Sequence, residues 1–61
     1  MLERLKIALD VLGYDAAREL HYRSDLIHAI QNFAIMQRDD ELEAACDAEI
    51  ETIRQAVMKR Q

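Results

Sequence analysis

Apolar residues recur at helical spacing in the first segment of the chain. Four leucines fall at three- and four-residue steps and therefore share one side of a helix over residues 2–12: Leu2, Leu5, Leu9 and Leu12. Ile7 and Val11 fall on roughly the opposite side of the same helix. Because a helix that is apolar on two sides usually lies between two other elements, one side is expected to pack on the chain and the other to meet a further surface.

Two longer helical segments follow a break at Gly13, the only glycine, which stands where a helix would end in a left-handed conformation. Asp15 is the N-cap candidate for a helix over residues 16–37. Asp40 with Glu43 resembles a capping box that opens a third helix over residues 41–59. The break between these helices is short, so they are expected to form an antiparallel hairpin. The sequence thus predicts an all-α fold: one helical domain over residues 1–61, with a short N-terminal helix followed by the hairpin.

Each hairpin helix has an apolar side at a period close to 3.6 residues. The second helix presents Leu20, Tyr22, Leu26, Ile27, Ile30, Phe33 and Ala34. The third helix presents Leu42, Ala45, Cys46, Ile50, Ile53, Ala56 and Val57. Cys46 is therefore expected to be a small core residue.

Charged residues interrupt both apolar sides. Glu19 and Arg23 stand four positions apart in the second helix, a spacing that favours an intrahelical ion pair. The hairpin register would bring Glu19 close to Arg60, whereas Glu49 falls near Ile30 without a basic partner inside the hairpin. Two interpretations stay open for Glu49: its carboxylate reaches water from the edge of the apolar side, or it meets a cation on another subunit or target.

The size of the chain favours self-association. A domain of 61 residues buries only about 60% of the surface that its unfolded form exposes, so its core leaves little margin of stability. One cysteine excludes an internal disulfide and fits a reducing compartment, so the cytoplasm is the expected location. A net charge of −4 disfavours generic nucleic-acid binding, and no apolar run is long enough for a membrane span.

Few residues in the chain could carry chemistry. His21, Asp25 and His28 share one helix side at a spacing that could hold zinc, but a solvated helix side is the expected reading, and no metal or cofactor is predicted. Ser24 is the only serine and Thr52 the only threonine, and no arrangement of a nucleophile with a base is visible in the sequence. An enzyme is not expected from a chain too small to enclose a water-free cavity.

Two classes of function remain. The first is a small regulator, inhibitor or adaptor that binds a partner protein through helical surfaces as a homodimer. The second is an RNA-binding helical bundle, by analogy of architecture alone with the plasmid copy-number regulator called repressor of primer. The scattered basic residues favour the first class. The residues expected at the partner or dimer surface are Leu5, Ile7, Leu9, Val11, Glu19, Arg23, Ile27, Ile30, Glu49 and Ile53.

Overall fold

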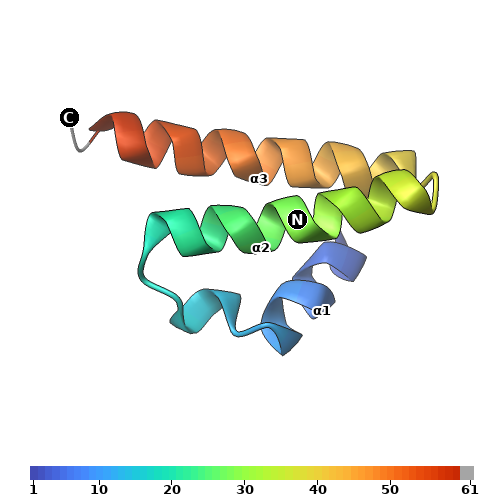
Figure 1. The fold of residues 1–61 in the computed structure, drawn as a ribbon, viewed down its shortest axis with the longest axis horizontal. Helices are drawn as coiled ribbons and strands as arrows, with labels where there is room; N and C mark the ends of the chain where they lie inside the picture. The colour runs from blue at the N-terminus through green and yellow to red at the C-terminus, as the bar shows by residue number, and fades with distance from the viewer. Residues whose placement is uncertain (60–61) are drawn as a thin grey trace.

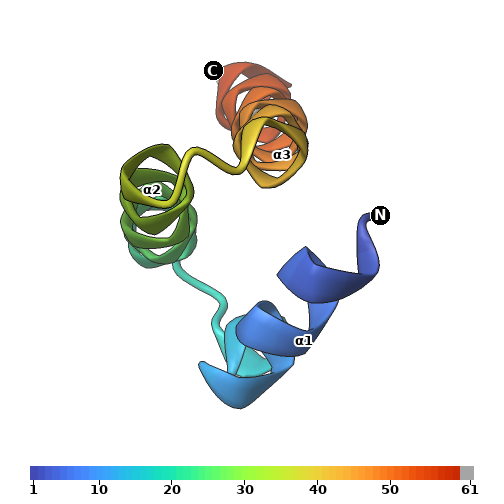
Figure 2. The same cartoon turned by 90° about the vertical axis from the view of Figure 1, so that its right-hand side faces the viewer.

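The computed structural model describes residues 1–59 and is built from helices throughout this range. It contains α1 (Glu3–Val11), a short 3₁₀ helix η1 (Tyr14–Ala16), α2 (Leu20–Met36) and α3 (Asp40–Lys59). α2 and α3 run antiparallel side by side, and α1 lies across one side of this hairpin (Figure 1). Seen along the hairpin, the three α-helices stand at the corners of a triangle (Figure 2). The predicted all-α fold with a short first helix and a hairpin is confirmed.

The core lies where the apolar sides of the three α-helices meet. Each helix contributes residues three, four or seven positions apart, which is the spacing of one helix side. The buried set is Leu5, Leu9, Tyr14, Ile27, Ile30, Ala34, Leu42, Cys46 and Ile53. Cys46 is fully enclosed, which confirms its assignment to the core.

A left-handed glycine ends the first helix. Gly13 has φ 74°, and its N–H donates to the Asp10 carbonyl, while the Leu12 N–H donates to the Ala8 carbonyl. A Cβ at Gly13 would meet no atom within 4 Å, so glycine is favoured by the backbone conformation rather than by lack of space. The prediction for Gly13 is confirmed, and the turn sends the chain into η1.

The start of α2 differs from the prediction. Asp15 lies in η1, Ala17 is extended, and α2 begins at Leu20 rather than at residue 16. Glu19 is the N-cap, because its carboxylate accepts the N–H groups of His21 (3.1 Å) and Tyr22 (2.8 Å). Two backbone donors that the helix cannot satisfy, together with the helix dipole, favour a carboxylate here. The prediction that Glu19 belongs to the helix interior is therefore wrong.

The turn between α2 and α3 is a Schellman motif. The Asp39 N–H donates to the Ala34 carbonyl (2.9 Å) and the Arg38 N–H to the Ile35 carbonyl (3.1 Å). Arg38 occupies the left-handed position with φ 55°, where glycine is the common residue.

Asp39 caps α3, because its Oδ1 accepts the Leu42 N–H at 3.1 Å. The predicted cap, Asp40, is instead the first residue of the helix. Arg4 donates to both Asp39 carboxylate oxygens at 2.8 and 3.0 Å, so one carboxylate caps α3 and also ties α1 to the hairpin turn.

The left-handed backbone at Arg38 generates a prediction. Replacing Arg38 by Gly should raise the free energy of unfolding by about 0.5–1 kcal/mol, because a Cβ is disfavoured in this conformation. Arg38→Ala is the matched control, since it removes the same charge and keeps the Cβ. Chemical denaturation of the three proteins measures the effect. Equal stability of the Gly and Ala variants would contradict the explanation.

Candidate functional site

Tyr14 joins the η1 segment to the hairpin. Its side chain is 4% exposed, and its hydroxyl donates to Oε1 of Glu49 on α3 at 2.8 Å. The Gly13 turn directs this residue inward just after α1 ends. The sequence predicts no basic partner for Glu49 inside its own hairpin, and the structure supplies an uncharged donor from outside the hairpin, the Tyr14 hydroxyl. The Tyr14 hydrogen bond accounts for Glu49 without a cation on another molecule.

The Arg23 guanidinium lies over the face of the Tyr14 ring. Its guanidinium carbon lies 4.1 Å from the centroid of the Tyr14 ring, which is a cation–π distance. The Arg23 Nε atom is buried and has no hydrogen-bond partner among the described residues. Two of the charged residues that interrupt the apolar helix sides, Arg23 and Glu49, therefore both contact Tyr14. Arg60, the expected neighbour of Glu19, lies outside the described residues.

The surroundings of Tyr14 keep its hydroxyl protonated. Burial, followed by the hydrogen bond to Glu49 and the negative charge of Glu49, raises the pKa of Tyr14 to about 12. The Arg23 charge acts in the opposite direction and is outweighed. Tyr14 at neutral pH is thus a hydrogen-bond donor rather than a proton acceptor, and the cluster is suited to structural support.

The exposed apolar surface lies on α1 and α2. Six large side chains are more than half exposed there: Ile7, Val11, Tyr22, Phe33, Ile35 and Met36. On α1, Ile7 lies three residues after Arg4 and Val11 lies three residues after Ala8, so these four residues share one side of the helix. A groove of about 370 Å³ separates the two helices and is lined by Arg4, Ala8, Ala29, Ile30, Phe33, Asp39 and Leu42. The exposed apolar surface of α1 and α2 therefore includes a groove.

The predicted partner-surface residues divide into three groups. Leu5, Leu9, Ile27, Ile30 and Ile53 are buried in the chain's own core, which accounts for them without a partner. Arg23 and Glu49 bind Tyr14, and Glu19 caps α2. Ile7 and Val11 are left exposed on α1. Their contact with another molecule stays a prediction.

The candidate metal ligands His21, Asp25 and His28 are exposed on α2. Among residues 1–59, no group of three or more His, Cys, Asp or Glu side chains is placed to hold a metal ion. Burial raises the pKa of the Cys46 thiol, and the neighbouring Asp47 charge adds to the effect. The thiol is therefore kept in its unreactive, protonated form.

Comparison of the chain with protein-family models, with curated proteins and with solved structures found no match. Within the described residues, each helix is too short or too polar to cross a bilayer. Function is therefore inferred from the chain's own surface and contacts.

The contact between Tyr14 and Glu49 should be measurable as stability. Tyr14→Phe removes the donor to a carboxylate and is expected to lower the free energy of unfolding by about 1.5–3 kcal/mol. Glu49→Leu should also destabilise, because it leaves the buried hydroxyl without an acceptor. The double variant should lose less than the sum of the two single losses, and denaturation of all four proteins measures this coupling.

Tyr22→Phe is the control for this cycle. Tyr22 is half exposed, so this substitution should alter the free energy of unfolding by less than about 0.5 kcal/mol. A Glu49→Leu protein more stable than the parent, with Tyr14→Phe neutral, would show that the hydrogen bond does not support the fold.

Tyr14 also makes stability depend on alkaline pH. Its folded pKa of about 12 lies above its ordinary value of 10.0, so the stabilisation is complete below pH 10 and is lost as pH rises from 10 toward 12. Two pKa units correspond to about 2–3 kcal/mol. Denaturation across this pH range should show that the free energy of unfolding falls more steeply with pH for the parent than for Tyr14→Phe. Parallel curves for the two proteins would contradict the assigned role.

Proposed function

We propose that the protein is a non-enzymatic regulator or adaptor that acts as a homodimer and binds a partner protein through the apolar surface of α1 and α2. The observation that carries this proposal is the set of large apolar side chains left exposed on these two helices, among which Val11 is 80% and Met36 79% exposed. Extended apolar area on a small chain favours association, because each Å² removed from water contributes about 25 cal/mol.

The groove between α1 and α2 defines the kind of partner. Its floor includes the buried Ile30 and Leu42, and its walls carry Ala8, Ala29 and Phe33. A hollow of this composition suits the apolar side of a helix, which enters such grooves by residues three and four positions apart. Ile7 and Val11 extend the apolar wall along α1.

The basic residues favour a protein over RNA. Arg4 lies within 3.5 Å of Glu41 and is hydrogen bonded to Asp39, and Arg54 lies 3.5 Å from Glu51. Acidic neighbours offset the field that would attract phosphates, and RNA affinity depends on that field. The RNA-binding alternative is therefore the weaker proposal and is distinguished by nuclease treatment.

The proposal predicts that Ile7→Ser combined with Val11→Ser abolishes partner capture. Both side chains are exposed, so circular dichroism and the melting temperature should change little. Loss of two apolar contacts of about 1.5 kcal/mol each or more corresponds to at least roughly a hundredfold weaker binding. Quantitative pull-down from a lysate of the source organism, with and without nuclease, measures the effect.

The matched control is Lys6→Ser with Asp10→Ser, two exposed positions about a quarter turn around α1 from Ile7 and Val11. A partner captured by the parent and the control, and lost with the Ile7 and Val11 variant, supports the proposal. A partner retained by both variants would contradict it, and capture that depends on nuclease-sensitive material would favour RNA binding.

A further inference from the structure

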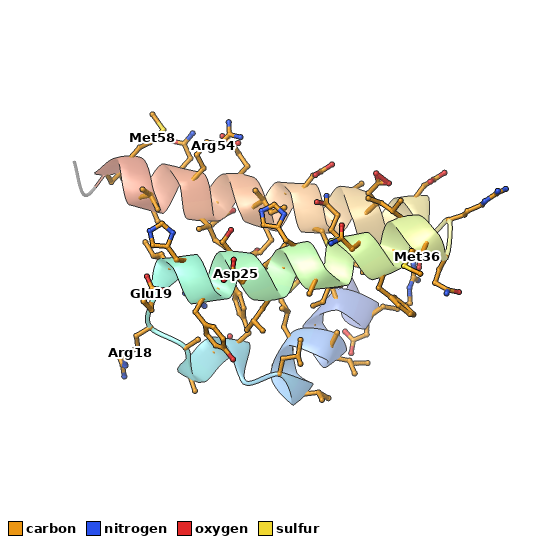
Figure 3. The ribbon with its side chains drawn as sticks, viewed as in Figure 1. Arg18, Glu19, Asp25, Met36, Arg54 and Met58 are labelled. Carbon is orange, nitrogen blue, oxygen red and sulfur yellow. The ribbon has the colours of Figure 1, made fainter. Side chains whose placement is uncertain are left out.

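The chain divides at Arg18 into two parts that are hydrogen bonded within themselves. The Ala17 N–H donates back to the Tyr14 carbonyl at 3.1 Å, whereas the Glu19 carboxylate accepts N–H groups at the start of α2. Ala17 and Glu19 both have extended backbones. Figure 3 shows Arg18 directed away from the helices, next to Glu19. The part before Arg18 is called here the α1–η1 unit (residues 3–17), and the part after it is the α2–α3 hairpin.

The α1–η1 unit is attached to the hairpin by few contacts. Its buried side chains are Leu5, Leu9 and Tyr14. Arg4 pairs with Asp39 at one end of the unit, and Tyr14 donates to Glu49 at the other. α1 has nine residues, and isolated helices shorter than about 12–15 residues are marginal in water. The hairpin helices have 17 and 20 residues and contribute the rest of the buried core. Segments with few buried contacts open at a lower free energy than the whole domain.

We infer that the α1–η1 unit is a hinged cover, which opens as one body about Arg18 while the α2–α3 hairpin stays folded, and that this opening controls the groove between α1 and α2. The groove takes Arg4 and Ala8 from the cover and Ala29 and Phe33 from the hairpin, so it exists only in the closed form. The inference rests on the proposed function and adds a regulation of its site. A partner that touches both walls binds the closed form and thereby opposes opening.

The ion pair that holds the cover lies in the groove itself. Arg4 and Asp39 are both among the residues that line it, and the Arg4 guanidinium also lies 3.5 Å from a Glu41 carboxylate oxygen. The Arg4 side chain is 53% exposed, so dissolved salt screens its charge. Opening of the cover, and with it loss of the groove, should therefore become easier as ionic strength rises.

Cys46 reports the opening. It lies four residues after Leu42, which lines the groove beside Arg4, and three residues before Glu49, which binds Tyr14. The three α3 residues therefore share the side of the helix that the α1–η1 unit covers. Cys46 is 0% exposed in the closed form. Removal of the cover should expose its thiol, the only one in the chain, to a dissolved reagent.

The rate at which iodoacetamide alkylates Cys46 tests the inference on the whole chain without any partner. The rate is measured at urea concentrations well below the unfolding midpoint, with reagent dilute enough that the rate is proportional to it. The urea dependence of labelling reports the surface exposed by the opening that admits the reagent. A hinged cover predicts a clearly weaker dependence than that of global unfolding measured by circular dichroism. Equal dependences would show that the thiol is reached only when the whole domain unfolds, which would overturn the inference.

Substitutions on the cover and on the hairpin should act differently. Arg4→Gln should raise the labelling rate roughly two- to fivefold, the effect of losing an exposed ion pair, and salt at about 1 M should remove its difference from the parent. Tyr14→Phe should raise the rate by about tenfold or more, because a hydrogen bond to a carboxylate is lost. Unchanged rates in both variants would contradict a cover held by these two contacts.

The matched control is Val57→Ala. Val57 is half-buried between α3 and α2, where it lines a hollow with Leu20 and Ile50 at the far end of the hairpin. This variant should unfold globally at lower urea, yet its Cys46 labelling rate in the absence of urea should match the parent's. A labelling rate that rises in proportion to its loss of global stability would overturn the inference.

The results separate this inference from the proposed function. Labelling that follows global unfolding overturns the hinged cover, while partner capture through Ile7 and Val11 is measured independently and can still succeed. Local labelling of Cys46 in a protein that captures no partner supports the cover and contradicts the proposed function.

Discussion

The hydrogen bond from the Tyr14 hydroxyl to the Glu49 carboxylate holds the N-terminal third of the chain on the hairpin. α1 is short, and helices of its length are marginal in water without tertiary contacts. Leu5 and Leu9 supply its apolar contacts, Arg4 ties its start to the hairpin turn, and Tyr14 fixes its end. Because the apolar surface is built from α1 and α2 together, its shape depends on these attachments.

Glu49 and Arg23 are half-buried, and partial removal of a charged group from water costs free energy unless other contacts offset it. One tyrosine serves both, since its hydroxyl donates to Glu49 and its ring face receives Arg23. These two contacts thus help to fix the position of η1 on the hairpin. An apolar residue at position 14 would bury similar area without selecting this position, so the polar contacts add specificity to a core made mainly of aliphatic side chains.

Much of the fold could be predicted from the sequence, because helical spacing and the Gly13 turn are local signals. The hairpin, the enclosed Cys46 and the left-handed glycine all followed from them. The start of α2 could not be predicted in this way, because Asp15 is the more common type of cap residue, whereas the structure places Asp15 in η1 and caps α2 with Glu19. The bond between Tyr14 and Glu49 joins residues 35 positions apart, and a three-residue 3₁₀ helix has no periodicity that would reveal it.

Solution NMR of the side chains around Tyr14 tests the central claim most directly. With the guanidinium 4.1 Å above the ring centroid, ring currents should shift the side-chain protons of Arg23 upfield, and nuclear Overhauser contacts should link the Tyr14 ring to both Arg23 and Glu49. Arg23 protons at the shifts of an unstructured chain, with no contact from the Tyr14 ring to either residue, would contradict the account.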